Sequence, residues 1–480
     1  MLFNTLSFAV FFLIVFILYW FVFDKNLKKQ NLFLLLASLF FYSFWNFKFT
    51  FLLLFSIGLD FYVGKKIYNN TKNSTTKKRW LWLSIIINLS VLGVFKYYNF
   101  FIDNFVEIVT ALGFKAHLWT LNLILPIGIS FYTFHGLSYV IDVYKEKIKP
   151  VDSIIEYALF VSFFPLLVAG PIERATHLLP QIQKKRTFNY ETAICGLRQI
   201  LWGLFKKVVI ADSCAEYVDL IFDNPSHYSG STLVMGTILF SFQIYGDFSG
   251  YTDIALGVSR LLGIELLQNF SYPYFARDIA EFWRKWHISL SSWFRDYVYI
   301  PLGGSKSSKW IQIRNVFIVF MLIGFWHGAN WNFIIYGFIN FLYILPLVLF
   351  NENRRSIDVI SVTGFKSGLK IFSSMIFTFG LLSFARIFFR SENVESAFTY
   401  ISKMFSQSLF EFPEIFPKII ILILAVFMWI EWIGRKNRFA IEKLGFQWAK
   451  PFRIAFYYAL VLLILFFSGK NCNLFIFSFK

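Results

Sequence analysis

Hydrophobic segments recur along almost the whole chain, and they constrain its fold more than any other feature. They lie near 5–23, 32–46, 50–63, 81–97, 120–140, 155–170, 195–212, 232–246, 311–327, 330–350, 369–387, 418–433 and 453–468. A helix needs roughly 20 apolar residues to cross a bilayer, and several of these segments are shorter. We therefore expect an all-α polytopic membrane protein with about ten to twelve transmembrane helices, plus re-entrant or interfacial helices.

Composition supports this interpretation. Of the 480 residues, 57% are hydrophobic and 15% charged, whereas an ordinary soluble domain has about 45–50% apolar and about 25% charged residues. The net charge of +18 suits basic loops beside anionic lipid headgroups, so no nucleic-acid partner is predicted. No stretch is polar enough to form a soluble domain, and a single integral-membrane domain over 1–480 is expected. The three cysteines show no CxxC spacing, and no metal site is predicted.

The basic loops predict an orientation. Loops 24–30 and 64–80 are rich in lysine and are separated by two hydrophobic segments, so they lie on the same side of the membrane. Lysine and arginine in short loops stay in the cytoplasm. The N-terminus is therefore expected to be extracytoplasmic. No small-residue cleavage site follows segment 5–23, which we expect to be retained.

Polar residues gather in the middle of the chain, between about 240 and 335. They include Gln243, Asp247, Ser249, Asp253, Asn269, Asp278, Glu281, Arg284, Lys285, His287, Arg295 and Asp296. Ionisable groups close to membrane depth are costly and mainly face one another, a cavity or a substrate path. This region is therefore the predicted functional site.

Two histidines stand out in this region. Residues 281–296 (EFWRKWHISLSSWFRD) predict one amphipathic helix that carries His287, and an interfacial anchor without chemistry is the competing interpretation. His327 lies in 324–331 (GFWHGANW), where Gly324 and Gly328 permit close approach of another helix or a ligand. A single buried histidine is more often a core residue than a catalytic one. Two histidines beside tryptophan in the most polar region favour an active site.

Several chemistries lack their required motifs. The chain has no phosphate-binding GxxxxGK[ST] loop, no HExxH metal helix and no GxSxG nucleophile elbow. An ATPase, a metalloprotease and a serine hydrolase are therefore not predicted.

Six motifs in one order carry a resemblance to a known family. They are 126–134 (PIGISFYTF), 164–174 (FPLLVAGPIER), 243–255 (QIYGDFSGYTDIA), 269–274 (NFSYPY), 281–291 (EFWRKWHISLS) and 324–331 (GFWHGANW). Through them the chain resembles the membrane-bound O-acyltransferases, and within that family the bacterial branch that O-acetylates alginate, other exopolysaccharides or peptidoglycan. The matches mark residues 120–335 as the catalytic core.

The resemblance implies helices around a central tunnel in the bacterial cytoplasmic (inner) membrane, with acetyl-CoA as a cytoplasmic donor and no bound cofactor. A polysaccharide would accept the acetyl group on the far side. His327 matches the family's catalytic histidine and would act as general base, and His287 matches the second polar position. The residues expected to bind or orient the donor are Gln243, Asp247, Arg284, Arg295, Trp326 and Asn330.

Relatives of this branch also imply a partner, an extracytoplasmic esterase-like (SGNH-type) acetyltransferase, and the missing nucleophile elbow fits that division of labour. One departure concerns the C-terminal tail. Relatives often end in an aromatic tail with a tyrosine, whereas this chain has Phe477 within 475–480 (FIFSFK).

The sequence also leaves three other functions open. A proton-coupled transporter or flippase would also use a polar, histidine-bearing core, although carriers commonly show two related halves and no internal repeat is visible. A structural subunit is disfavoured by the costly polar cluster. D-alanyl transfer to teichoic acid is the close competitor within the family.

Overall fold

The computed structural model describes residues 1–70, 73–114, 120–121, 123–356, 360 and 364–469. All regular elements in these ranges are helices, which confirms the predicted all-α class. The described chain forms two compact units, Met1–Leu197 with Ala255–Leu267, and Arg198–Ile254 with Gln268–Lys480. The C-terminal tail around Phe477 lies outside the described residues.

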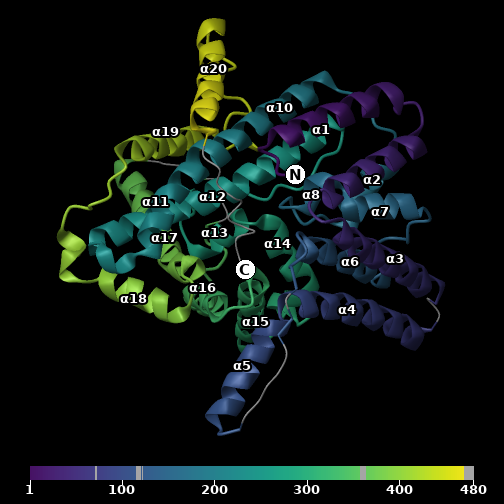
Figure 1. Cartoon of the computed structure of the whole chain (residues 1–480), viewed down its shortest axis with the longest axis horizontal. Helices are drawn as coiled ribbons and strands as arrows, with labels where there is room; N and C mark the ends of the chain where they lie inside the picture. Colours follow the sequence, from purple (N-terminus) through teal and green to yellow (C-terminus); the bar gives the residue numbers. More distant parts are fainter. Residues whose placement is uncertain (71–72, 115–119, 122, 357–359, 361–363, 470–480) are drawn as a thin grey trace. The chain divides into compact units, whose positions relative to one another are not determined.

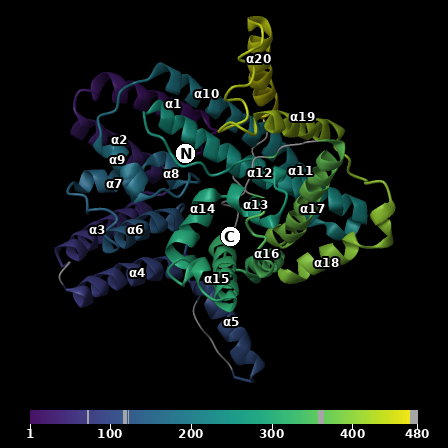
Figure 2. The same ribbon diagram turned by 180° about the vertical axis from the view of Figure 1, so that it is seen from behind.

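The first unit contains the N-terminal helices. They are α1 (Leu6–Ile17), η1 (Leu18–Val22), α2 (Leu27–Ser43), α3 (Phe47–Asn69), α4 (Ser74–Lys96), α5 (Tyr98–Ala111), α6 (Ile129–Tyr144), α7 (Ile154–Ser162), α8 (Phe164–Leu167) and α9 (Ala175–Gln183), followed by the start of α10 (Tyr190–Leu204). Asparagine side chains cap α2, α3 and α4 by accepting a backbone N–H of the first turn. Figures 1 and 2 show α3, α4 and α6 packed side by side.

The second unit contains the helices of the polar region. They are η2 (Phe205–Ala211), α11 (Asp212–Asp223), η3 (Pro225–His227), most of α12 (Gly230–Leu261), η4 (Pro273–Phe275), α13 (Ile279–Lys285), α14 (Ile288–Phe294), η5 (Arg295–Tyr299), η6 (Gly304–Lys306), α15 (Lys309–His327), α16 (Trp331–Leu349), α17 (Phe365–Arg390), α18 (Val394–Met404), η7 (Gln407–Phe410), α19 (Lys418–Gly434) and α20 (Lys450–Phe467).

Six of the described helices are long and apolar enough to cross a membrane by length and composition. They are α3, α4, α15, α16, α17 and α20. The protein is therefore a multi-pass membrane protein. The further spans expected among the shorter apolar helices, such as α1 with η1, α2 and α19, stay a prediction.

Two hydrophobic segments are more broken than predicted. Segment 155–170 is not one helix, because the chain turns at Phe163 (φ −53°, ψ 113°) between α7 and α8. In segment 120–140 the helix begins only at Ile129, after Gly128 with a φ of 75°. A Cβ atom at Gly128 would lie 2.1 Å from the carbonyl oxygen of Leu167. Only glycine fits this approach of the chain before α6 to α8.

Candidate active site

His287 lies at a break between two short helices, not within the single amphipathic helix that the sequence predicts. α13 ends at Lys285, α14 begins at Ile288, and His287 has left-handed backbone angles (φ 44°, ψ 53°). Segment 269–271 runs beside the break: the Ser271 N–H donates to the Lys285 carbonyl at 3.0 Å, and the Ile288 N–H donates to the Asn269 carbonyl at 2.9 Å. These tertiary bonds replace the hydrogen bonds of a continuous helix and hold His287 in a conformation that L-residues rarely adopt.

The imidazole of His287 is buried, with 1% of the residue exposed. Its Nδ1 lies 3.0 Å from the Oδ1 atom of Asn269. The ring packs edge-on against Phe248 of α12, with centroids 4.6 Å apart, and against Trp326, at 5.7 Å. Burial, followed by the nearby His327, holds the pKa of His287 well below its ordinary value.

His327 is the last residue of α15 and is surrounded by aromatic rings. Its imidazole lies 4.9 Å from the Trp326 ring and 4.9 Å from the Phe389 ring of α17. Tyr336 of α16 adds a third edge contact at 6.0 Å. The indole of Trp326 thus contacts both histidines, so the rings of His287 and His327 lie near one another.

Close packing of α15 against α16 supports this arrangement. A Cβ atom at Gly324 would lie 2.3 Å from the Phe333 carbonyl oxygen, and one at Gly337 would lie 2.5 Å from the Phe320 carbonyl oxygen. The two backbones therefore meet at glycines, as the position of Gly324 in the sequence indicates. The hairpin brings His327 at the end of α15 close to Tyr336 of α16.

Buried charges beside the site are paired. Lys207 of η2 bonds Asp247 of α12 at 2.7 Å and Asp212 at 2.8 Å, and each of these side chains is at most 5% exposed. The neighbouring Lys206 bonds Asp253 at 2.5 Å. Asp247 therefore joins η2 to α12, one residue before the Phe248 ring that packs on His287.

The other predicted site residues have varied surroundings. Gln243 is buried on α12, and its Oε1 has no hydrogen-bond partner among the described residues. Arg284 is exposed on α13 and donates to the carbonyl oxygens of Asn353 and Ser356. Arg295 is exposed and bonds the adjacent Asp296 at 2.8 Å.

Asn330 caps α16. Its side-chain oxygen accepts the Asn332 N–H at 2.9 Å, and its amide donates to the Glu392 carbonyl at 3.2 Å. The structure thus brings the side chains of His287, His327 and Trp326 together. Arg284 bonds backbone carbonyl groups, Arg295 bonds the adjacent Asp296, and Asn330 caps α16.

Comparison with known proteins shows the family of the chain. The model of the membrane-bound O-acyltransferase family matches residues 40–357. The chain belongs to this family. It is 39% identical to the peptidoglycan O-acetyltransferase of Helicobacter pylori, over 84% of this chain and 80% of the relative. It is 36% identical to the probable alginate O-acetylase AlgI of Pseudomonas aeruginosa, over 86% of this chain and 77% of the relative.

The competing D-alanyl branch is more distant. The teichoic acid D-alanyltransferase of Bacillus subtilis is 33% identical over 45% of this chain and 57% of the relative. The protein is therefore an O-acyltransferase of the membrane-bound family, and the acetylating branch is the more similar one. Family membership favours the enzyme over the transporter or flippase.

The sequence predicted no individual role for two residues that lie beside the two histidines. Asn269, which bonds His287, was visible only as a polar residue within an aromatic motif. Arg386 of α17 is 2% exposed, donates to the Tyr274 hydroxyl at 2.9 Å, and lies over the Trp286 ring at 4.9 Å. An arginine within an apolar span was the available signal, because buried cations in membranes are costly.

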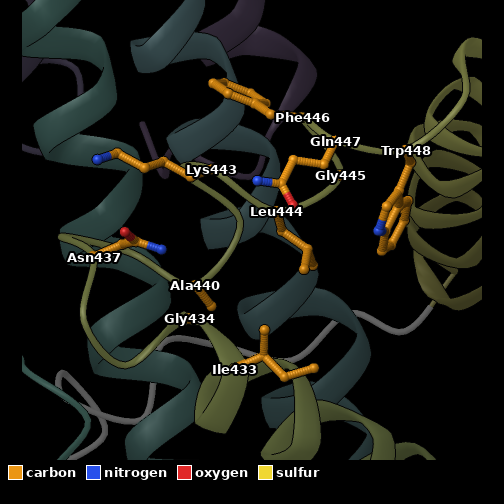
Figure 3. Close-up of a pocket in the computed structure, with 10 residues that line it drawn as sticks. All are labelled: Ile433, Gly434, Asn437, Ala440, Lys443, Leu444, Gly445, Phe446, Gln447 and Trp448. Atoms are coloured by element: carbon orange, nitrogen blue, oxygen red, sulfur yellow. The ribbon is translucent and has the colours of Figure 1, made fainter.

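A pocket of about 370 Å³ lies in the loop between α19 and α20 of the acyltransferase (Figure 3). The side chains of Lys443 and Trp448 lie on opposite sides of this loop (Figure 3), so its polar groups do not converge on one point. The loop also makes a hydrogen bond to a residue close to Asn269. The Asn437 carbonyl accepts the Tyr272 hydroxyl at 3.1 Å, three residues after Asn269.

Proposed function

We propose that this acyltransferase passes an acetyl group from acetyl-CoA on the cytoplasmic side across the membrane, for O-acetylation of an extracytoplasmic polysaccharide, either peptidoglycan or an alginate-like exopolysaccharide. The observation that carries the proposal is the pairing of His287 and His327 on the indole of Trp326. The names of the relatives support the acetyl group and these two acceptors.

The chemistry requires one proton acceptor. We assign this role to His327, which removes the hydroxyl proton as the oxygen attacks the thioester carbonyl. The bond to sulfur then breaks, and the proton passes from His327 to the leaving CoA thiolate. General base catalysis of this kind contributes about 10²–10⁴-fold to the rate. The rings of Phe389 and Tyr336 pack edge-on against the His327 imidazole and restrict its orientation.

Orientation and partner belong to the same proposal. The lysine-rich segments 24–30 and 64–80 suit a cytoplasmic face and an extracytoplasmic N-terminus in the bacterial inner membrane. A separate extracytoplasmic SGNH-type enzyme would then place the acetyl group on the polysaccharide.

Transfer by the purified protein in liposomes tests the function. Labelled acetyl-CoA is supplied, and both CoA release and labelled acceptor are measured. We expect His327→Ala to reduce transfer by at least 100-fold with an unchanged melting temperature. His227→Ala, at an exposed position in η3, is the matched control. Near-normal transfer by His327→Ala would refute the role of His327.

Donor competition separates the acetyl and D-alanyl hypotheses. Acetyl-CoA and a D-alanyl thioester carrier protein are supplied at equal concentration to the same liposomes. The proposal expects label from acetyl-CoA. Label only from the D-alanyl carrier would place the chain in the teichoic acid branch, and uptake without CoA release would indicate a carrier.

A further inference from the structure

Asn269 receives three hydrogen bonds at a single oxygen. The residue is 0% exposed. Its Oδ1 lies 2.9 Å from Ser289 Oγ, 3.3 Å from the Ser289 backbone nitrogen and 3.0 Å from His287 Nδ1. The Ser289 backbone N–H can only donate, so the amide atom that faces it must be the carbonyl oxygen. The orientation of the Asn269 amide is thereby fixed.

This orientation determines the tautomer of His287. An amide oxygen only accepts hydrogen bonds, so the Nδ1 atom of His287 must carry the hydrogen. A neutral imidazole has one N–H, and its Nε2 therefore carries the lone pair. That Nε2 is buried and has no hydrogen-bond partner among the described residues. An unpaired buried acceptor is costly, which points to a hydrogen supplied by a bound molecule.

We propose that Asn269 is a positioning residue for acyl transfer: it fixes the Nδ1–H tautomer of His287 and so presents the Nε2 lone pair to a substrate N–H or O–H group. The proposal rests on the proposed function for the identity of the substrates. Backbone bonds support the same role, because the Asn269 carbonyl also accepts the Ile288 N–H next to His287.

Substitutions at Asn269 separate this role from simple packing. In Asn269→Ala, His287 is free to turn or to exchange tautomers, and we expect kcat to fall roughly 10–100-fold, as for other partners that orient a functional histidine. In Asn269→Asp, the carboxylate accepts the same three bonds, but its charge favours the imidazolium. The acid limb of the pH–rate profile should then move to higher pH by about one unit or more. The matched control is Asn88→Ala, another buried asparagine, which lies on α4 and donates to Asp60 at 2.8 Å.

The KM values of the Asn269 variants for the two substrates identify which substrate donates a hydrogen bond to Nε2 of His287. A rise in KM for acetyl-CoA assigns the hydrogen to the donor, whose pantetheine arm carries amide N–H groups, and a rise in KM for the polysaccharide assigns it to a sugar hydroxyl. A pH profile of Asn269→Asp equal to that of the wild type would overturn the proposal, as would Asn269→Ala with kcat within two-fold of the wild type. If Asn269→Ala does not fold, Asn269→Asp alone decides.

A spectroscopic measurement keeps the inference separate from the proposed function. The ¹⁵N shifts of ¹⁵N-histidine-labelled protein, assigned with His287→Gln, report which ring nitrogen carries hydrogen. We expect a protonated Nδ1 and a bare Nε2 in the wild type, and a mixture in Asn269→Ala. A protonated Nε2 in the wild type would contradict the tautomer assignment whether or not transfer is observed. Wild-type protein with the expected tautomer but without transfer would count against the function alone.

Discussion

The indole of Trp326 packs edge-on against the imidazole of His287, with ring centroids 5.7 Å apart, and its centroid lies 4.9 Å from that of the His327 ring. One side chain thus contacts both histidines. The edge-to-face contact with His287 is made by the aromatic ring of Trp326. Another large aromatic side chain at position 326 should therefore keep part of this contact.

The loss of transfer rate on substituting Trp326 should therefore be smaller when the new side chain is also an aromatic ring. We expect Trp326→Phe to keep transfer within about 10-fold of the wild type and Trp326→Ala to lower kcat about 100-fold, since a misplacement of about 1 Å costs that much. Rates of CoA release from acetyl-CoA measure the effect. Trp310→Ala, an 80% exposed tryptophan at the start of α15, is the control. Equal rates for Trp326→Ala and the wild type would remove Trp326 from the site.

The glycine contact between α15 and α16 predicts a stability effect. In Gly337→Ala the new Cβ would lie 2.5 Å from the Phe320 carbonyl oxygen, so the helices must separate. We expect a loss of about 1–3 kcal/mol in unfolding free energy, the usual range for overpacking. Thermal unfolding in detergent measures it. Gly380→Ala in α17 is the matched control, because its added Cβ would have no atom within 4 Å from any other part of the described chain. Equal melting temperatures for both variants would contradict the tight contact.

The long helices of this fold could be predicted from the sequence because a continuous apolar run is a local signal. The segments predicted at 311–327 and 369–387 are helices at Lys309–His327 and Phe365–Arg390. A continuous helix through His287 was predicted because the amphipathic spacing of residues 281–296 favours one. The break depends on backbone bonds from segment 269–271, which is distant enough in sequence to leave no local trace.

The same limit applies to the candidate site. The histidine motifs could be read from the sequence, and the structure does bring His287 and His327 to the same indole. The role of the Asn269 amide in orienting His287 could not be predicted from the sequence, because the hydrogen bond between these two residues forms only in the tertiary structure. Arg284 and Arg295 stood out as charges, but charge alone does not tell a substrate contact from a bond to a nearby carbonyl or carboxylate.

The buried pair of Lys207 and Asp247 should be costly to break. In Lys207→Met two carboxylates, Asp247 and Asp212, lose their cation while remaining buried, and we expect a loss of about 3–5 kcal/mol in unfolding free energy. Arg355→Met removes an ion pair with Glu352 whose side chains are 65% and 47% exposed, and it should cost about 0–1 kcal/mol. Denaturant titration in detergent compares the two. A loss below 1 kcal/mol for Lys207→Met would show that the carboxylates are stabilised in another way.

A pH-dependent contribution to stability is expected from His177 at the start of α9. The Nδ1 atom of His177 lies 2.8 Å from the buried carboxylate of Glu173. This hydrogen bond raises the pKa of His177 above its ordinary value of 6.5. The folded state therefore holds the proton more tightly than the unfolded chain. Its contribution is fully present below about pH 6.5 and is lost as the pH rises through the folded pKa.

Melting temperatures between pH 6 and about 8.5 test this sign. The wild type should lose more stability over this window than His177→Asn, which has no titrating ring, so the two curves converge at high pH. His227→Asn at the exposed η3 position should retain the slope of the wild type. Curves for wild type and His177→Asn that run parallel would show that the bond to Glu173 is no more stable with a charged ring than with a neutral one.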